Sequence, residues 1–470
     1  MTDPMIVFSL KNFAAYVVLA ASTVVLLAGC DTGTEQGANT LDGQLRTTLD
    51  AAAGVQGIDY FLLPDSGDLS ALPHDPRNPL TPEKVELGRL LFHETALAVN
   101  PVREVGRGTY SCASCHHAAA GFQPGRRQAI GEGGSGFGRA GEGRSLHPDY
   151  APGEADAQPI RTLSPLNGAW QRVAFWSGQF GASGPNAGTS NRWLAGTPLA
   201  VNRLGYEGLE SQAIAALNVH RMADGADTVA ARYPAYQRLF EQAFPERTAG
   251  EQVSHETAGL AIAAFERTLV ANKAPFQQWL RGNVEALTAA EKRGAVVFFG
   301  SGGCITCHTG PALGSATFHA LGMGDLDGPD LVTTPDPSNP VHFGRGGFTG
   351  RDEDRYRFKT PQLYNLADHA AFGHGATFPS IRAVIEYKNE GVPQSPYVPS
   401  HRLAPPFQPL RLTPAEIDDL VAFLKHGLYD PDLQRYAPRA LPSGHCFPNN
   451  DVQSRRDLHC EAATDSSTRP

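Results

Sequence analysis

Two Cys-x-x-Cys-His pentapeptides are the residues of this sequence whose types and spacing could do chemistry. They are Cys112-Ala-Ser-Cys115-His116 and Cys304-Ile-Thr-Cys307-His308. In this pattern the two thiols form thioethers to a porphyrin, and the adjacent His becomes the proximal iron ligand of a c-type haem. A redox dithiol would not need the trailing His, and a zinc site would need further ligands that the cysteine count does not supply. The sequence therefore predicts two covalently bound haem c groups.

The N-terminal segment is predicted to direct export. Lys11 precedes an apolar run, residues 13–28, that is too short for a comfortable membrane span. The run ends in Leu27-Ala28-Gly29-Cys30, which resembles the lipobox of bacterial lipoproteins. This resemblance implies cleavage before Cys30, lipid on its thiol, and a membrane-anchored lipoprotein facing the periplasm, with membrane contact through that lipid alone. A plain secretory signal is the alternative, and it also places the protein outside the cytoplasm.

Two cysteines remain after the haem motifs and Cys30 are set aside. Cys446 and Cys460 lie in a Pro- and Asn-rich C-terminal stretch. In an exported protein such a pair is expected to form a disulfide, which would stabilise a tail that has little core of its own. Two free thiols are the alternative.

Size and charge restrict the class of protein. A chain of 470 residues can form two or three domains with proper cores. The net charge is −9 and no basic run stands out, so we expect no nucleic-acid binding. Clusters of Gly and Pro lie between the periodic segments and predict long loops, above all over residues 121–210.

Similar helix signals precede both haem motifs. Thr81-Pro82 predicts a helix start before the first motif, and Thr288 with Glu291 forms a capping box before the second. A pattern of Glu-Lys, Gly and Phe recurs in both segments: Glu83-Lys84, Gly88 and Phe92, then Glu291-Lys292, Gly294 and Phe298. The repetition indicates a duplicated cytochrome c-like unit.

Helical patterns also cover residues 255–271 and a segment that starts at Thr413-Pro414 and is closed by Glu416, while little of the sequence alternates with period two. We therefore predict a mainly α fold of two cytochrome c-like domains, each binding one covalent haem, with long irregular loops. The predicted segments are a signal peptide (1–30), a flexible tether (31–57), an N-terminal haem domain (58–272), a C-terminal haem domain (273–435) and a tail with the disulfide (436–470).

Further stretches give this chain a family resemblance. Phe175-Trp176-Ser177-Gly178 and Phe358-Lys359-Thr360-Pro361-Gln362-Leu363-Tyr364-Asn365 are similar to two segments of the bacterial di-haem cytochrome c peroxidase and MauG family. His374 falls at the His of the family's Tyr-Met-His-Asp-Gly. The resemblance covers roughly residues 60–430. It implies an enzyme that reduces hydrogen peroxide with electrons from a small cytochrome c or cupredoxin. It also implies that the N-terminal haem domain is peroxidatic, that the C-terminal haem domain serves electron transfer, and that Trp176 carries electrons between the haems.

The second haem departs from the peroxidases at its distal ligand. In the peroxidases a Met fills this position. Here Tyr387, in the predicted helix Ile381–Lys388, takes its place, and MauG-like members also have Tyr there. A phenolate stabilises oxidised iron and lowers the reduction potential, whereas a thioether favours ferrous iron. A buried core tyrosine is the alternative, and Met323 in Gly322-Met323-Gly324 is a rival ligand.

The first haem departs more strongly. Glu132 stands where the peroxidases have a distal His, and a carboxylate is a poor ligand for ferrous haem, so we expect an iron open to peroxide. Gln212 matches a Gln that the family places above this haem, but the family's Glu, expected near residues 219–222, is missing. Peroxide cleavage needs a proton acceptor and donor, for which His220 aided by Arg221, or Glu132, is the candidate. A structural histidine and a solvated loop acid are the alternatives.

The expected function is thus that of a di-haem peroxidase. A MauG-like enzyme that oxidises a Trp or Tyr of a partner protein is the first alternative, which Tyr387 favours. A di-haem electron carrier or sensor without peroxidase turnover is the second, which the missing Glu favours. The resemblance also implies a calcium ion between the haems, with Thr162 at the position of the family's Asn.

Overall fold

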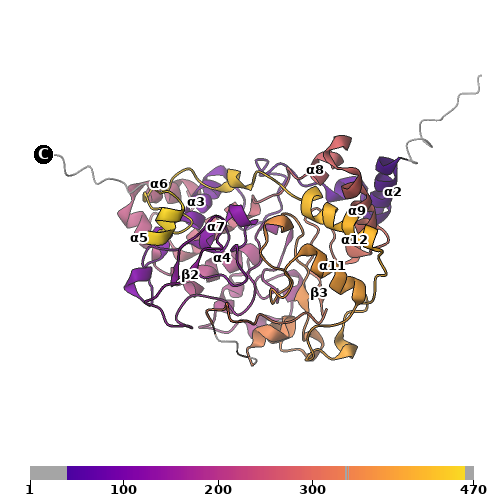
Figure 1. Ribbon diagram of the computed structural model, residues 1–470. Coiled ribbons are helices and arrows are strands. Elements are labelled where there is room, and N and C mark those ends of the chain that lie inside the picture. The colour runs from indigo at the N-terminus through magenta and orange to yellow at the C-terminus, as the bar shows by residue number, and fades with distance from the viewer. Residues whose placement is uncertain (1–39, 334–335, 337, 461–470) are drawn as a thin grey trace, which may run out of the picture.

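The computed structural model describes residues 40–333, 336 and 338–460. The fold is mainly α, as predicted (Figure 1). The helices are α2 (Leu41–Ala53), α3 (Pro82–His93), α4 (Gly208–Val219), α5 (Gly225–Arg232), α6 (Pro234–Ala243), α7 (His255–Arg267), α8 (Pro275–Leu280), α9 (Ala289–Phe299), α10 (Arg345–Thr349), α11 (Ile381–Glu390), α12 (Pro414–Ala422) and α13 (Val452–Asp457). Two short antiparallel pairs, β1 (Gly134–Ser135) with β2 (Ser145–Leu146) and β3 (Phe318–His319) with β4 (Phe358–Lys359), complete the regular structure.

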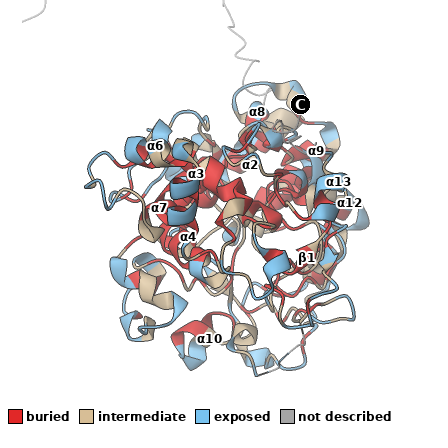
Figure 2. Ribbon diagram, turned by 90° about the vertical axis from the view of Figure 1, so that its left-hand side faces the viewer, coloured by how far each residue is buried: buried red, intermediate tan, exposed pale blue. Residues whose placement is uncertain are grey.

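The helices pack in two groups, one beside each haem motif. In the first group α7 packs against both α3 and α4, and α6 packs against α3. In the second group α9 packs against α12 and α2, and α11 packs against α12. Buried residues concentrate in α3, α4 and α7 (Figure 2). One apolar core runs through both groups, so the predicted boundary between residues 272 and 273 stays a prediction.

The predicted caps fix where the helices beside the motifs begin. Thr81 Oγ1 accepts a hydrogen bond of 3.2 Å from the amide of Lys84 at the start of α3. At the start of α9 the side chains of Thr288 and Glu291 form the predicted capping box, and Thr413 and Glu416 form another at the start of α12. These three predictions are confirmed.

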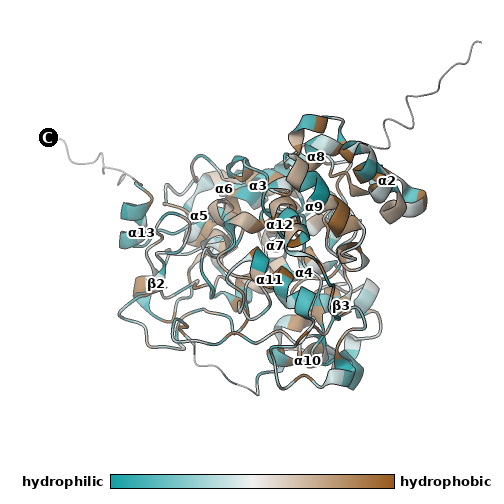
Figure 3. Cartoon of the chain, turned by 45° about the vertical axis from the view of Figure 1, so that its right-hand side comes forward, coloured by the Kyte–Doolittle hydropathy of each residue, from teal (hydrophilic) through white to brown (hydrophobic). Residues whose placement is uncertain are grey.

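The predicted flexible tether is wrong over residues 41–53, which form α2. Leu45 and Leu49 are fully buried, and the helix packs on α9 at the edge of the molecule beside α8 (Figure 3). Asp42 anchors it by accepting hydrogen bonds from Trp279 Nε1 (2.7 Å) and Lys292 Nζ (2.9 Å). The helix is mostly polar and its apolar stripe is narrow, so its composition alone predicts a linker. Residues 31–39 and the whole signal segment with Cys30 lie outside the described residues.

The long loops have the irregular structure expected. Between the first haem motif and α4 the chain forms 3₁₀ turns and the β1–β2 pair, with no α-helix over residues 121–207. Nowhere in the described part of the chain is there a helix with the length and hydropathy needed to cross a membrane.

The C-terminal tail closes over the first haem motif. Cys446 and Cys460 form a disulfide with a Cα–Cα distance of 5.9 Å, as the cysteine count predicts. The hydroxyls of Ser111 and Ser114 both donate to the carbonyl oxygen of Pro448, at 2.9 and 3.1 Å. The tail therefore packs against the loop that carries Cys112, although more than 300 residues separate the two in the chain.

Two equivalent glycines allow a close approach of the helices beside each motif. A Cβ on Gly88 would lie 1.8 Å from the carbonyl oxygen of Ala261 in α7, and one on Gly294 would lie 2.0 Å from that of Asp419 in α12. These are the glycines of the repeated sequence pattern. The repetition of this glycine in the chain thus has a packing cause, since only a hydrogen atom fits between the two helix backbones at each position.

We predict that Gly88→Ala and Gly294→Ala each lower the free energy of unfolding by about 1–3 kcal/mol, because the added methyl group must push two helix backbones apart. Gly250→Ala is the matched control, since a Cβ there meets no atom within 4 Å. Denaturant unfolding monitored by far-UV circular dichroism measures the three midpoints. Equal midpoints for Gly88→Ala and Gly250→Ala would contradict the packing argument.

Candidate functional site

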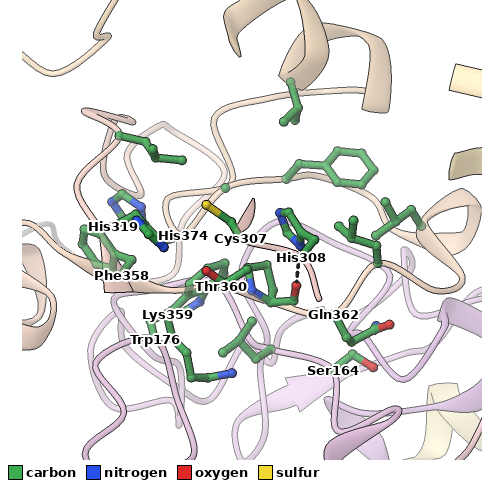
Figure 4. A pocket seen from close by; sticks show the side chains of 18 of the residues that line it. Ser164, Trp176, Cys307, His308, His319, Phe358, Lys359, Thr360, Gln362 and His374 are labelled. Atoms are coloured by element: carbon green, nitrogen blue, oxygen red, sulfur yellow. Dashed lines mark hydrogen bonds between the residues drawn. The ribbon is translucent and has the colours of Figure 1, made fainter. Parts of the chain in front are cut away.

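One cavity of about 300 Å³ is lined by residues of both haem motifs. His116 contributes from the first motif, and Cys304, Cys307 and His308 contribute from the second. Much of the remaining lining is apolar. Figure 4 shows Cys307 and His308 together on the cavity, with Trp176, Phe358 and His374 grouped nearby. The two motifs therefore open into a shared space.

Both proximal imidazoles are oriented by backbone carbonyls. His116 Nδ1 donates to the carbonyl oxygen of Phe122 (3.3 Å), and His308 Nδ1 lies 3.1 Å from the carbonyl oxygens of Leu313 and Pro361 (Figure 4). Because Nδ1 carries the hydrogen, Nε2 keeps its lone pair for a metal. Burial lowers the pKa of His116 to about 4 and that of His308 to about 3, so both rings are neutral, as ligands must be.

The four motif cysteines do not form a redox dithiol or a zinc site. Burial raises the pKa of Cys112 and Cys115 to about 12 and that of Cys304 to about 11, whereas reactive dithiols have lowered values. Within the described ranges, no group of three or more His, Cys, Asp or Glu side chains is placed to hold a metal ion. Paired thiols, a neutral imidazole and an apolar cavity fit covalently attached haem.

Two buried cations that line the cavity have no carboxylate partner among the described residues. Arg161 donates to the carbonyl oxygen of Gly373 (2.7 Å) and to Gln123 Oε1 (2.9 Å), and Lys359 Nζ donates to Gln171 Oε1. Burial lowers the pKa of Arg161 to about 10 and that of Lys359 to about 7. A buried cation is costly without a counter-charge. The propionates of bound haem would supply that charge, so these side chains fit the same group.

Trp176 lies on the shared cavity in a fixed orientation. Its Nε1 donates to the carbonyl oxygen of Arg161 at 2.7 Å, and the guanidinium of Arg161 lies 5.4 Å from the ring centre. The ring contacts those of Phe358 and His374, which stack on each other at 3.6 Å. The indole is thus part of an aromatic cluster on the cavity that joins the two motifs.

A His–Asp pair lies near the first motif. His220 is the C-cap residue of α4, and its Nδ1 donates to Asp156 Oδ2 at 2.6 Å. Tyr110 donates to the carbonyl oxygen of His220 (2.8 Å) and so holds its backbone. Burial by itself would lower the pKa of His220, but the charge and hydrogen bond of Asp156 outweigh it, and the pKa is raised above its usual 6.5. His220 lies within electrostatic reach of His116, although it does not line the shared cavity.

Comparison with known proteins agrees with this geometry. The profile of the family described as di-haem cytochrome c peroxidase matches residues 82–285. The methylamine utilization protein MauG of Methylorubrum extorquens is 31% identical over 362 residues, which cover 76% of this chain and 81% of that protein. The chain belongs to the di-haem cytochrome c peroxidase family.

Other members are similar over comparable lengths. Cytochrome c peroxidase Ccp of Escherichia coli K12 is 28% identical over 359 residues, covering 76% of this chain and 61% of that protein. The crystal structure of a MauG-like protein associated with microbial copper homeostasis superposes with a TM-score of 0.53 at 26% identity, covering 79% of this chain and 95% of that one. The di-haem peroxidase fold and the two haem c groups follow from this membership.

Glu132 and Arg221 pair with each other. Glu132 is fully buried and forms an ion pair with Arg221. It also accepts hydrogen bonds of 2.5 Å from the hydroxyl of Tyr150 and the amide of Val102. The alternative of a solvated loop acid is therefore wrong for Glu132, and the roles of Glu132 and Arg221 in peroxide cleavage stay predictions.

The structure also does not bring Tyr387 to the second haem motif. Its hydroxyl donates to the carbonyl oxygen of Leu321 (2.5 Å), its ring packs between Phe378 and Phe407, and it is absent from the cavity lining. The cause is helical geometry, because adjacent residues point about 100° apart. Two other residues proposed from the sequence, Gln212 and Met323, do line the cavity, so Met323 stays a rival ligand of the second haem.

The sequence patterns did not mark two residues of the site. Asp156 lies 64 positions before its partner His220 in an irregular loop, where no local pattern marks it. Lys388 lines the cavity one position after the tyrosine. Its place could have been found from the cavity-facing spacing of Ile381, Val384 and Ile385, which it continues.

We predict two covalent haems per chain and one in the double variant Cys112→Ala/Cys115→Ala, because each motif attaches one porphyrin. The same loss is expected for Cys304→Ala/Cys307→Ala. Intact-protein mass and the pyridine haemochrome spectrum give the count. Cys446→Ala/Cys460→Ala is the control and keeps both haems. A single haem in the unchanged protein would contradict this prediction.

Proposed function

We propose that this protein reduces hydrogen peroxide with electrons from a small periplasmic redox protein, a cytochrome c or a cupredoxin. The observation that carries the proposal is the shared cavity, on which His116, His308 and Trp176 all lie. Haem bound at the two motifs would supply peroxide activation and one-electron transfer. Similar proteins named cytochrome c peroxidase support the assignment, including Ccp of Escherichia coli and cytochrome c551 peroxidase of Nitrosomonas europaea.

The His220–Asp156 pair takes the proton-transfer role in this proposal. With its hydrogen on Nδ1 held by Asp156, the ring keeps Nε2 free to accept a proton from peroxide and to return it to the leaving oxygen. Asp156 fixes the tautomer and stabilises the protonated ring, as carboxylates do beside catalytic histidines. Gln212, which lines the cavity from α4, is placed to donate a hydrogen bond to the substrate. Trp176 would pass electrons across the cavity.

We predict that His220→Gln lowers the second-order rate of the reaction with peroxide by about 10²-fold or more, the usual contribution of a general base. The neutral ring is the active form and its pKa is raised, so the rate of the unchanged protein climbs as pH rises through a value above 6.5. In Asp156→Asn the lowering effects of burial and of the Arg221 charge on the pKa of His220 remain, so the midpoint moves below 6.5. Stopped-flow absorbance across a pH series measures both effects.

Glu132→Gln is the contrasting variant in that series. It breaks a buried ion pair and should lower stability by about 3 kcal/mol, while leaving the pH midpoint in place. A midpoint that moves in Glu132→Gln but stays in Asp156→Asn would transfer the proton role to Glu132. A peroxide rate unaffected by His220→Gln would remove it from His220.

A second candidate function is oxidation of a Trp or Tyr residue on a partner protein. The observation that favours it is the 31% identity to a protein named MauG. Mass spectrometry of a co-purified protein after peroxide treatment separates the two. An oxidised aromatic residue formed in step with peroxide use supports the second candidate, and peroxide turnover that depends on a reduced cytochrome supports the first. Absence of any peroxide consumption would leave only the electron carrier or sensor.

Membrane attachment and calcium complete the proposal. The Leu27-Ala28-Gly29-Cys30 sequence supports a periplasm-facing lipoprotein, and calcium between the haems rests on the family resemblance with Thr162 in place of Asn.

We predict that the mature N-terminal peptide begins with lipid-modified Cys30 and that Cys30→Ser releases the protein from membranes. Mass spectrometry and fractionation test the first point, and elemental analysis of the holoprotein tests the second. An unmodified Cys30 would indicate a plain secretory signal.

A further inference from the structure

Helix α11 presents one donor-bearing residue to the second haem motif. Ile381, Val384, Ile385 and Lys388 line the cavity, with the i, i+3, i+4, i+7 spacing of one helix face. The first three are apolar, so the amine of Lys388 is the only group on this face that could bind a metal or an anion.

Lys388 has no counter-charge in the described part of the chain. Across residues 40–333, 336 and 338–460, no carboxylate pairs with its Nζ and no side chain or carbonyl accepts a hydrogen bond from it. Its electrostatic neighbours are Cys304, Cys307 and the imidazoles of His308 and His319. The amine therefore lines the cavity beside the haem attachment residues, and no described residue pairs with it.

The position beside both cysteines does not suit a partner of a propionate. In haem c the two thioethers lie on adjacent pyrroles, and the propionates leave the opposite edge of the ring. Arg161 has a different setting, because it acts electrostatically on His369 and His374. A side chain that acts on Cys304, Cys307 and His308 together would lie over a bound ring or at its thioether edge.

Two rival donors are engaged elsewhere, and a third lies on another side of the cavity. Tyr387 is held by its hydrogen bond to Leu321, and α11 cannot easily rotate to free it, because Asn389 exchanges hydrogen bonds with the backbone of Leu412. Met323 lines the cavity beside Gly373, whose carbonyl accepts from Arg161, and its sulfur lies 3.4 Å from the point where Gly373 would carry a Cβ. His319 Nε2 is hydrogen-bonded to the hydroxyl of Thr317 at 2.9 Å.

We propose that Lys388 Nζ is the distal ligand of the second haem, opposite His308. This inference rests on the two-haem assignment and deepens the proposed function. A neutral amine has one lone pair to give to the iron, and metal binding releases its proton. Two nitrogen donors make a low-spin iron and favour its ferric form over the ferrous form relative to a Met ligand. The second haem is then six-coordinate and closed to peroxide, and the first haem is the one that reacts.

The experiment is electron paramagnetic resonance and near-infrared magnetic circular dichroism of the fully ferric holoprotein, without peroxide. We expect a low-spin haem with His and amine ligands. Lys388→Ala and Lys388→Arg should both lose this signal, since guanidinium keeps the charge but cannot bind iron. Tyr387→Phe is the matched neighbouring control and keeps it, as do Met323→Leu and His319→Ala. Covalent haem content, measured in each variant, shows that the fold has survived.

Lys388→Met gives a second test should the smaller variants fold poorly. A thioether can bind in the same place, so this variant should stay low-spin with a His–Met signature and a higher reduction potential. The proposal is overturned by a signal that persists in Lys388→Arg, by its loss in Tyr387→Phe, Met323→Leu or His319→Ala, or by an unchanged spectrum in Lys388→Met.

The two proposals fail separately. A protein that turns over peroxide but whose low-spin signal ignores Lys388 loses only the ligand assignment. A protein whose signal depends on Lys388 but which does not consume peroxide loses only the peroxidase function.

Discussion

The rest of the site depends on how the two proximal imidazoles are held. His116 and His308 each donate Nδ1–H to a backbone carbonyl of the loop that follows their motif, which turns Nε2 toward the cavity. The turn of each motif contacts a helix, α3 or α9, whose glycine packs on a neighbouring helix backbone. Two iron sites in one cavity follow from this arrangement, and with them the possibility of passing electrons through Trp176 rather than through solvent.

A second constraint is charge inside an apolar space. Arg161, Lys359 and Lys388 line the cavity without a carboxylate partner among the described residues, whereas Glu132 pairs with Arg221 and Asp156 with His220 outside the lining. Unpaired cations are tolerated in a protein interior when a bound group balances or ligates them. These two ion pairs therefore lie outside the cavity lining, and the three cations of the lining are left for a bound group to balance.

The sequence predicts features that depend on neighbouring residues, and it misses those that depend on residues far apart in the chain. Caps, haem motifs and repeated glycines are local, so the mainly α fold and the helices from Thr81, Thr288 and Thr413 follow from neighbouring residues. Asp156 could not be found, because its relation to His220 exists only after the loop folds back. The place of Tyr387 was missed for a different reason: one residue along a helix is a turn of about 100°, so Lys388 lines the cavity and Tyr387 does not.

The tail seen against the first haem motif has a consequence for biogenesis. Ser111 and Ser114 donate to the carbonyl of Pro448, a residue synthesised more than 300 positions after them. Until the tail that carries Pro448 has folded, it does not cover the Cys112–Cys115 loop. Once it is in place, with the Cys446–Cys460 disulfide joining the two sides of Pro448, the tail lies against this loop. Access to the two motif thiols is therefore greatest before the tail has folded.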